Sequence, residues 1–245
     1  MEHATSNLIT STLPFFLLIV FPFLAALCIY QVRSLPVQSF IVTVSGTLLA
    51  AGALLLVPRV PLSLTLAPFW GIDPHGILSC ADLLLLCAIL YLGFKLRDPV
   101  IKVLSVMQIS LLAILQFFIK NGKNPAEIFY VDDLALMLIL VASAATTLST
   151  MRLSFIPCLR ALEEEPSLKQ SSRHRFFALL LVCLGALDGM VLSNDMSFFY
   201  FFFELITLGS FLLIEQKGTP GAEKKAVQTL SLTSLAGFIF LLAMA

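Results

Sequence analysis

The chain has 245 residues, of which 59% are hydrophobic and 12% are charged, and its formal net charge at pH 7 is zero. A soluble domain carries about twice this fraction of charged residues, so the composition excludes an ordinary soluble protein and indicates an integral membrane protein. The neutral balance, without a Lys/Arg cluster, gives no reason to expect a nucleic-acid partner.

Several apolar runs are long enough to cross a bilayer as helices, which takes about 20 residues each. In chain order the runs cover residues 13–32, 37–57, 77–96, 99–119, 131–151, 176–194, 197–215 and 226–245. They are too long and too unalternating for barrel strands, and only helices or closed barrels satisfy the backbone in the hydrocarbon region. The sequence therefore predicts an all-α polytopic protein with about eight transmembrane helices, in the cytoplasmic (inner) membrane of a bacterium or archaeon.

The basic residues orient these helices. Of the 15 Lys and Arg residues, 12 fall in loops that would share one side of the membrane, and only Arg59, Lys120 and Lys123 fall on the other side. Because the positive side faces the cytoplasm, both termini are expected outside, which is the periplasm in a bacterium. On the outer side, Trp70 is expected as an interfacial anchor.

The connection 152–175 is the longest charged loop of the sequence. We interpret its run Glu163–Glu165 as a solvated loop feature, with a docking patch for a soluble partner as the alternative. The five cysteines and three histidines form no C-x-x-C pair and no ligand cluster, so no metal site and no cofactor are expected in this chain.

One carboxylate lies deep in an apolar segment. Residues 201–214 read FFFELITLGSFLLI, and Glu204 lies about eight residues into its predicted helix, roughly 12 Å down at 1.5 Å per residue. An ionisable group near the midplane is costly, so it usually faces the bundle interior and marks a transport pathway. The alternative is a carboxylate that only satisfies a helix–helix contact.

Helical spacing places Glu204 in a polar seam on its helix. The seam consists of Ser197, Tyr200, Glu204, Thr207 and either Ser210 or Phe211. Burial disfavours the charged form of a carboxyl group and a nearby cation favours it, so a group held between the two effects can load and release a proton. The cations considered are Lys224 and Lys225, whose alternative role is positive-inside anchoring and snorkelling.

Other polar residues lie inside the predicted helices. Asp188, beside Gly185 and Gly189, is either a packing contact or a second proton-relay group. Asp195 is expected to cap a helix, and Asp132 and Asp133 to begin one. In the first half of the chain, the strongly polar residues well inside the segments are Asp82, Gln108 and Gln116.

From about Asp132 onwards the sequence resembles the antiporter-like membrane subunits of respiratory complex I, Mrp-type cation/proton antiporters and energy-converting membrane hydrogenases. The most specific stretch is FELITLGSFLLI, which is similar to the family pattern W-E-L-M-x-L-x-S-Y-x-L-I; DDLALMLILVASAATTLST and GAEKKAVQTLSLTSLAGFIFLL match flanking helices. The resemblance implies that Glu204 is an essential proton-carrying residue. It also implies a functional lysine at Lys225, with Lys224 as the fallback.

The resemblance divides the chain into an N-terminal four-helix membrane region, 1–128, and antiporter-like helices, 129–245, that match the start of the first inverted repeat. Family members have two helices before the acidic-start helix, whereas four are expected here. Family members also have about fourteen helices in total, including a broken helix with a lysine or histidine and a second repeat. The sequence is therefore expected to represent a shortened or split subunit, with the N-terminal half only.

These features predict a membrane subunit of a redox-driven proton or sodium pump of the complex I or membrane hydrogenase type, with a partial proton path centred on Glu204. We expect no redox site in this chain, since redox chemistry would lie on peripheral subunits at the cytoplasmic side, and other membrane subunits would supply the missing helices. The alternatives are a structural scaffold subunit without transport of its own, and an Mrp-type sodium/proton antiporter component.

Overall fold

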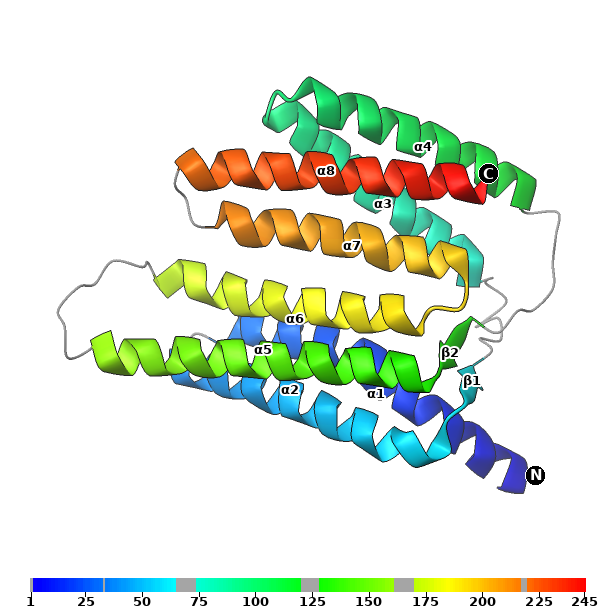
Figure 1. Ribbon diagram of the computed structural model, residues 1–245, viewed down its shortest axis with the longest axis vertical. Helices are drawn as coiled ribbons and strands as arrows, with labels where there is room; N and C mark the ends of the chain where they lie inside the picture. Colours follow the sequence, from blue (N-terminus) through cyan, green and yellow to red (C-terminus); the bar gives the residue numbers. More distant parts are fainter. Residues whose placement is uncertain (1, 33, 65–73, 120–127, 161–169, 217–219) are drawn as a thin grey trace. The chain divides into compact units, whose positions relative to one another are not determined.

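A computed structural model describes residues 2–32, 34–64, 74–119, 128–160, 170–216 and 220–245 (Figure 1). The helices of these residues are α1 (Glu2–Gln31), α2 (Leu35–Leu56), α3 (Pro74–Lys95), α4 (Pro99–Ile119), α5 (Asp133–Arg160), α6 (Gln170–Leu192), α7 (Met196–Glu215) and α8 (Pro220–Met244). A 3₁₀ turn (Val57–Arg59) and two short paired strands, β1 (Leu62–Leu64) and β2 (Phe129–Val131), complete the described elements.

Each predicted segment corresponds to one of the eight helices in the described part of the chain, which confirms an all-α polytopic fold. Seven of these helices are long and apolar enough to span a membrane, and in α1 the apolar stretch with described side chains is Leu17–Gln31. The protein is therefore a multi-pass membrane protein.

Capping residues explain where several helices begin. Asp98 accepts a hydrogen bond from the backbone N–H of Val100 at 2.8 Å, and Pro99 opens α4, where its missing N–H costs nothing. Asp132 accepts one from the N–H of Ala135 at 2.7 Å before α5. The expected acidic start of α5 is thereby confirmed.

The boundaries of the longest predicted loop were wrong. α5 continues from the expected end at residue 151 to Arg160, and α6 begins at Gln170 rather than at 176. The physical reason is that Arg152 ends the hydrophobic span but not the hydrogen-bonded helix, which extends beyond the apolar length. Glu163–Glu165 and Trp70 lie outside the described residues.

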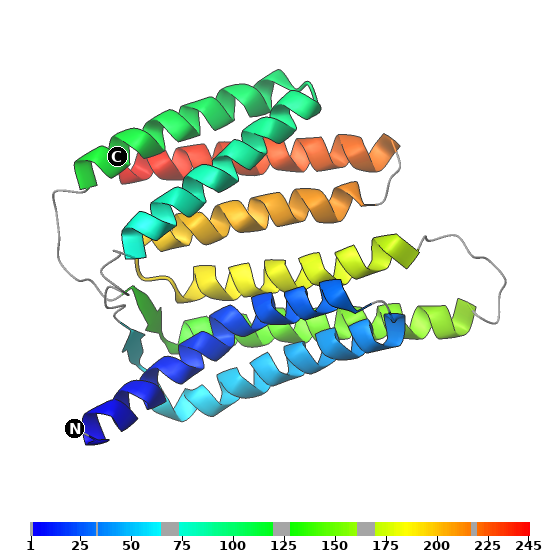
Figure 2. The same ribbon diagram turned by 180° about the vertical axis from the view of Figure 1, so that it is seen from behind.

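The helices group into two compact units, which are described separately. Unit 1 consists of residues 1–64 and 130–192, and unit 2 of residues 65–129 and 193–245. Each unit joins two helix pairs that are distant in sequence, α1 and α2 with α5 and α6 in the first, and α3 and α4 with α7 and α8 in the second (Figure 2). The division expected at residues 128/129 concerns family resemblance, and it remains a prediction.

In unit 1, α1 packs against α6 and α2 packs against α5. Small residues allow this close packing, as is common between membrane helices. A Cβ atom at Gly185 of α6 would lie 3.0 Å from Cβ of Pro22 in α1, and one at Gly46 of α2 would overlap the hydroxyl of Thr147 in α5. Thr147 itself donates to the carbonyl of Ser143 at 2.7 Å, so its hydroxyl is satisfied within its own helix.

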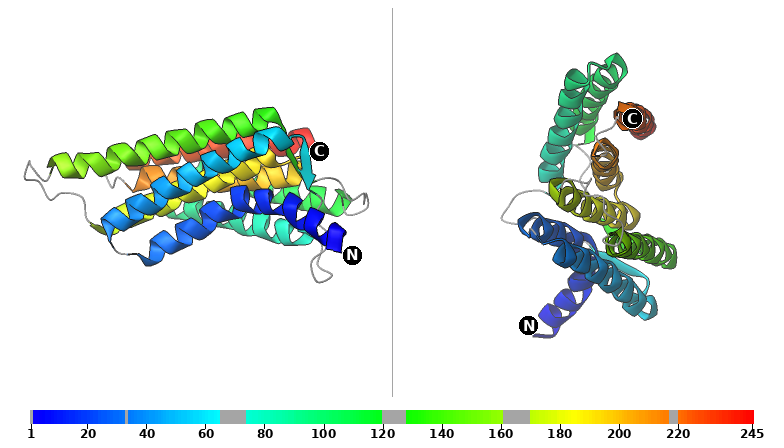
Figure 3. Two further views of the ribbon diagram at one scale, coloured as in Figure 1. Left: turned by 90° about the horizontal axis from the view of Figure 1, so that it is seen from below. Right: turned by 90° about the vertical axis from the view of Figure 1, so that its left-hand side faces the viewer.

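In unit 2, α7 packs against α3 and α8, and α4 packs against the same two helices. The helices of this unit run lengthwise beside one another, as the end-on view in Figure 3 shows. Two groups of buried apolar residues lie at different levels. The Tyr200 cluster consists of Leu86, Leu112, Leu115, Tyr200 and Leu241. The Phe211 cluster consists of Ile89, Ile101, Phe211, Ala226 and Leu230.

Candidate functional site

The site residues of α7 are aligned by the cap at the start of the helix. Asp195 accepts hydrogen bonds from the backbone N–H groups of Ser197 at 2.8 Å and Phe198 at 3.3 Å, which confirms its expected capping role. From this start, helical spacing turns Tyr200, Glu204 and Thr207 into the interior, where each is at most 1% exposed. Of the remaining seam residues, Phe211 is fully buried, while Ser197 and Ser210 are half-buried.

Three helices of unit 2 place residues at the same spacing between the two apolar clusters. On α7 the order is Tyr200, Glu204, Thr207 and Phe211. On α4 the order, in the opposite direction, is Leu112, Gln108, Ser105 and Ile101. On α8 it is Leu241, Gly237, Ser234 and Leu230. Steps of four, three and four residues keep each set on one face, so each helix contributes two inner positions flanked by apolar ones.

These inner positions form two layers. The carboxyl layer contains Glu204, Gln108 and Gly237, and the hydroxyl layer contains Thr207, Ser105 and Ser234. All of these residues are buried. On α3 the residues that contact the clusters are Leu86 and Ile89. The polar layers are therefore bounded by apolar side chains at both ends and on the α3 side.

Glu204 is held by a neutral partner. The side-chain Nε2 of Gln108 donates to Oε1 of Glu204 at 2.9 Å, and it also lies 3.4 Å from the hydroxyl oxygen of Tyr200. Glu204 and Gln108 are both 0% exposed. A single amide group thus ties α4 to two residues of α7 that lie one turn apart.

Gly237 makes room for this pair. A Cβ atom at position 237 would lie 2.5 Å from Oε1 of Glu204 and 2.8 Å from Nε2 of Gln108. Real side-chain atoms do not approach so closely, so a larger residue on α8 would displace the carboxyl or the amide group. Glycine at this position is a requirement of the site rather than of the helix.

Several buried oxygens in unit 2 have no hydrogen-bond partner among the described residues. They are Oε2 of Glu204, Oε1 of Gln108, Oγ of Ser105, Oγ of Ser234 and Oδ1 of Asp82. Asp82 lies on α3, one turn from Leu86, is 2% exposed, and is close enough to Glu204 for the two carboxyl groups to interact electrostatically. A buried polar atom without a partner is costly, which sets this region apart from the surrounding apolar core.

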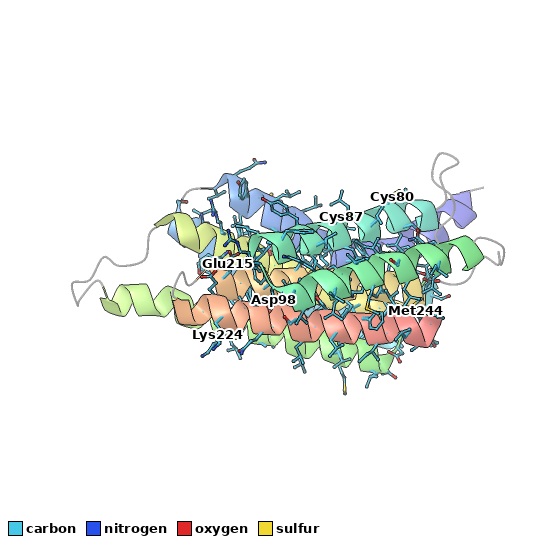
Figure 4. All side chains as sticks on the ribbon, turned by 90° about the horizontal axis from the view of Figure 1, so that it is seen from above. Cys80, Cys87, Asp98, Glu215, Lys224 and Met244 are labelled. Atoms are coloured by element: carbon cyan, nitrogen blue, oxygen red, sulfur yellow. The ribbon has the colours of Figure 1, made fainter. Side chains whose placement is uncertain are left out.

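The lysines expected to join Glu204 lie elsewhere on α8. Lys224 and Lys225 are exposed, and Lys225 precedes Gly237 by twelve residues of the same helix, or about 18 Å at 1.5 Å per residue. Figure 4 shows Lys224 near the opposite end of α8 from Met244. The structure therefore does not bring these lysines to the carboxyl layer, and their role in a proton path stays a prediction.

Asp188 belongs to unit 1 rather than to the unit that contains Glu204. It is fully buried in α6, and neither of its carboxyl oxygens has a hydrogen-bond partner in the described part of the chain. Its neighbour one turn away, Gly185, contacts Pro22 and Phe23 of α1. Its place in a relay with Glu204 is untested and stays a prediction.

Sequence reasoning identified Glu204 and Tyr200 but did not assign Gln108, Gly237, Ser105, Ser234 or Asp82 to the site. Gln108 and Asp82 were conspicuous as strongly polar residues inside apolar segments, although nothing in the sequence joined them to α7. The shared spacing on α4, α7 and α8 was a further signal, which becomes meaningful only once the three helices are known to be neighbours. Within the described residues, no group of three or more His, Cys, Asp or Glu side chains is placed to hold a metal ion.

Comparisons with known proteins find curated relatives among the largest-lettered components of sodium/proton antiporters, those named A or A1. The A component of the Na⁺/H⁺ antiporter of Alkalihalophilus pseudofirmus is 33% identical over 122 residues, which make up 47% of this chain and 14% of that protein. Its Bacillus subtilis counterpart is 41% identical over 73 residues, 27% of this chain and 9% of that protein. The A1 component from Staphylococcus saprophyticus is 36% identical over 80 residues, 30% of this chain and 10% of that protein.

The chain spans only 9% to 14% of the length of these relatives. No protein-family model matches it, and no solved structure matches it. The relatives are bacterial proteins, and together with the apolar helices they place the chain in the bacterial inner membrane as a multi-pass protein.

Proposed function

We propose that this chain, a member of the antiporter-like membrane subunit family that includes the Mrp-type antiporters, takes part in sodium/proton exchange and that Glu204 takes up and releases the transported proton. The observation that carries the proposal is the setting of Glu204: a fully buried carboxyl group at the middle of a membrane-spanning helix, bonded through one oxygen to a neutral amide. Such a group inside a membrane usually marks an ion pathway.

The hydrogen bond from Gln108 is compatible with both charge states of Glu204. When the carboxyl is ionised, the amide N–H stabilises the negative charge on Oε1. When it is protonated on Oε2, which has no partner among the described residues, the same amide still donates to Oε1. Proton binding therefore requires no rearrangement of the Gln108 contact, which suits a group that is loaded and unloaded repeatedly.

The described part of unit 2 offers Glu204 no permanent counter-ion. Lys95, Arg97, Lys224 and Lys225 are exposed, and Lys102 is half-buried with its ammonium 5.0 Å from the ring centre of Phe94. A lysine locked to Glu204 would favour a fixed ion pair and a scaffold role. Its absence among these residues supports a carboxyl group whose charge is balanced by a mobile ion.

The printed names of the relatives favour sodium/proton exchange over the redox-driven pump as the process served. On this proposal, the partners are other membrane subunits of an antiporter complex. The redox-driven pump remains the second candidate, because the same family of subunits serves both kinds of machine. Isolation of the complex separates the two: co-purification of iron–sulfur or flavin subunits, with transport that requires an electron donor, would support the redox pump.

The transport role of Glu204 is tested by Glu204→Gln in the complex expressed with its associated subunits. We expect sodium-induced proton efflux from everted membrane vesicles, followed with a pH-gradient dye, to fall at least tenfold, since glutamine cannot bind and release a proton. The control is Glu223→Gln, the same change at an exposed position in the first turn of α8, which should leave transport unchanged. Full transport by an assembled Glu204→Gln complex would instead establish the scaffold alternative.

A further inference from the structure

The carboxyl and hydroxyl layers of unit 2 contain oxygens that ordinary helix packing leaves unexplained. Ser105 and Ser234 are 0% exposed, and neither hydroxyl has a partner in the described residues. Other hydroxyl residues of the same two helices bond to the carbonyl four residues earlier: Ser110 to Val106 at 2.8 Å on α4, and Ser231 to Val227 at 2.9 Å on α8. This local bond is the usual way to satisfy a hydroxyl within a helix.

The two unusual serines occupy matching positions. Ser105 lies one turn from Gln108, and Ser234 lies one turn from Gly237, in both cases toward the Phe211 cluster. Their helices, α4 and α8, pack directly against each other. Because Gly237 closely approaches both Glu204 and Gln108, the hydroxyls of the next layer lie about one helical turn from the unpaired oxygens of the carboxyl layer.

We propose that Glu204, Gln108, Ser105 and Ser234 form a binding site for a single sodium ion, which competes with the proton for Glu204. The inference rests on the proposed function, since it adds the second ion to the same carboxyl group. Four buried oxygens without partners supply the ligands: Oε2 of Glu204, Oε1 of Gln108 and the two serine Oγ atoms. Hard cations take oxygen ligands of these kinds, and intramembrane sodium sites lie near the bilayer midplane.

Charge favours a monovalent ion at this position. One carboxylate and three neutral oxygens balance a single positive charge, whereas a divalent ion would leave an excess charge in a region of low polarity. The facing ionisable groups are Tyr200 on α7 and Asp82 on α3, and the latter interacts electrostatically with Glu204. On α4 and α8 the nearest described cations, Lys102 and Lys225, lie six residues from Gln108 and twelve from Gly237, so neither occupies the site.

Mutually exclusive occupancy follows from the geometry. Oε2 of Glu204 is both the position for an added proton and the charged ligand needed by sodium, so the two ions exclude each other there. The apolar Tyr200 and Phe211 clusters close the layers at both ends, which limits direct access of water to the bound ion. A site of this kind couples the release of one ion to the uptake of the other.

The experiment measures equilibrium binding of radioactive ²²Na⁺ to the purified complex by scintillation proximity, at several pH values. We expect bound sodium to be displaced as the pH falls, and the double variant Ser105→Ala/Ser234→Ala to bind at least tenfold more weakly. The matched control is Ser110→Ala/Ser231→Ala, which removes the two serines whose hydroxyls bond within their own helices, and it should bind as the unaltered complex does.

The result that overturns the site is sodium binding that is absent from the unaltered complex or equal in the Ser105/Ser234 variant and its control. A second measurement covers the case in which the double variant fails to assemble: labelling of Glu204 by dicyclohexylcarbodiimide in the unaltered complex. Sodium should slow this labelling at least fivefold, and potassium should slow it less. Labelling that is unaffected by sodium would also overturn the proposal.

The two proposals fail in different ways. Loss of transport in Glu204→Gln, without any sodium binding at the serines, would leave the proton role intact and remove the sodium site. Sodium binding that depends on the serines, with full transport by Glu204→Gln, would retain the site and remove the proton role.

Discussion

The two compact units of this protein are both built from two helix pairs, yet they treat a buried acid differently. In unit 1, Asp188 lies fully buried among close helix contacts, with neither carboxyl oxygen paired among the described residues. In unit 2, Glu204 has a directed donor in Gln108, a glycine that makes room for the pair, and neighbouring hydroxyls. Burial alone is therefore a weak sign of function, whereas an arranged set of neutral donors and oxygens from several helices is a stronger one.

Unit 1 also uses its hydroxyl groups in a different way. On α5, Thr146, Thr147 and Thr150 each donate to a carbonyl of their own helix, at 2.9, 2.7 and 2.8 Å. The hydroxyls thus act as small packing residues whose polarity is satisfied locally. In unit 2, Ser105 and Ser234 lack such bonds, which indicates that their hydroxyls are available to a ligand.

The largest effect is expected from removing the donor to Glu204. Gln108→Leu leaves the carboxyl without a partner and adds no charge of its own, so sodium/proton exchange should fall by about tenfold to a hundredfold, in line with the two to three kcal/mol of a lost charged hydrogen bond. The control is Gln116→Leu, at a half-buried position on the same helix. Equal exchange in the two variants would show that Gln108 does not support Glu204.

A smaller effect is expected from Gly237→Ala. The added methyl group meets the ends of two flexible side chains rather than backbone, so the helix should fold while the Glu204–Gln108 hydrogen bond is displaced. We expect the apparent pH dependence of exchange to shift and the rate to fall about threefold to tenfold, since a close contact of this kind costs about 1 kcal/mol or more. Gly221→Ala, where a Cβ atom meets nothing within 4 Å, should leave both quantities unchanged.

In unit 1 the corresponding glycine change should affect stability rather than transport. A Cβ atom at Gly185 would lie 3.0 Å from Cβ of Pro22 and 3.1 Å from the ring of Phe23. These groups are held in the α1–α6 contact, so Gly185→Ala should lower the thermal denaturation midpoint of the purified complex by a few degrees, for a cost of about 1 kcal/mol. Transport per assembled complex should stay the same; a changed pH profile would contradict this purely structural role.

The smallest effect is expected from Asp188→Asn, which keeps the shape of the side chain and removes its ability to ionise. If Asp188 is a packing group, exchange per assembled complex should change by less than about twofold. A loss of exchange comparable with that of Glu204→Gln would instead identify Asp188 as a second relay group and would remove the contrast between the units. The comparison is sharpest when the two variants are assayed in the same vesicle preparation.

Much of the architecture could be predicted because the membrane constrains it strongly. The length of the apolar runs predicted every described helix, and the caps at Asp132 and Asp195 followed from residue type and position. The end of α5 could not be predicted in the same way, because hydropathy reports where a segment leaves the lipid and not where its backbone hydrogen bonds end. The grouping of α3 and α4 with α7 and α8 was likewise absent from the pattern of apolar runs.

The sequence by itself determined that the chain is a helical membrane protein, that Glu204 lies deep within one helix, and that its surroundings resemble the antiporter-like subunits. These properties depend on local composition and on helical periodicity, which the order of residues contains directly. Only the tertiary structure decided that Glu204 meets Gln108 rather than a lysine, and that Ser105 and Ser234 lie in the adjoining layer. Contacts between helices distant in sequence depend on which faces pack together, and in this protein that packing converts isolated polar residues into one site.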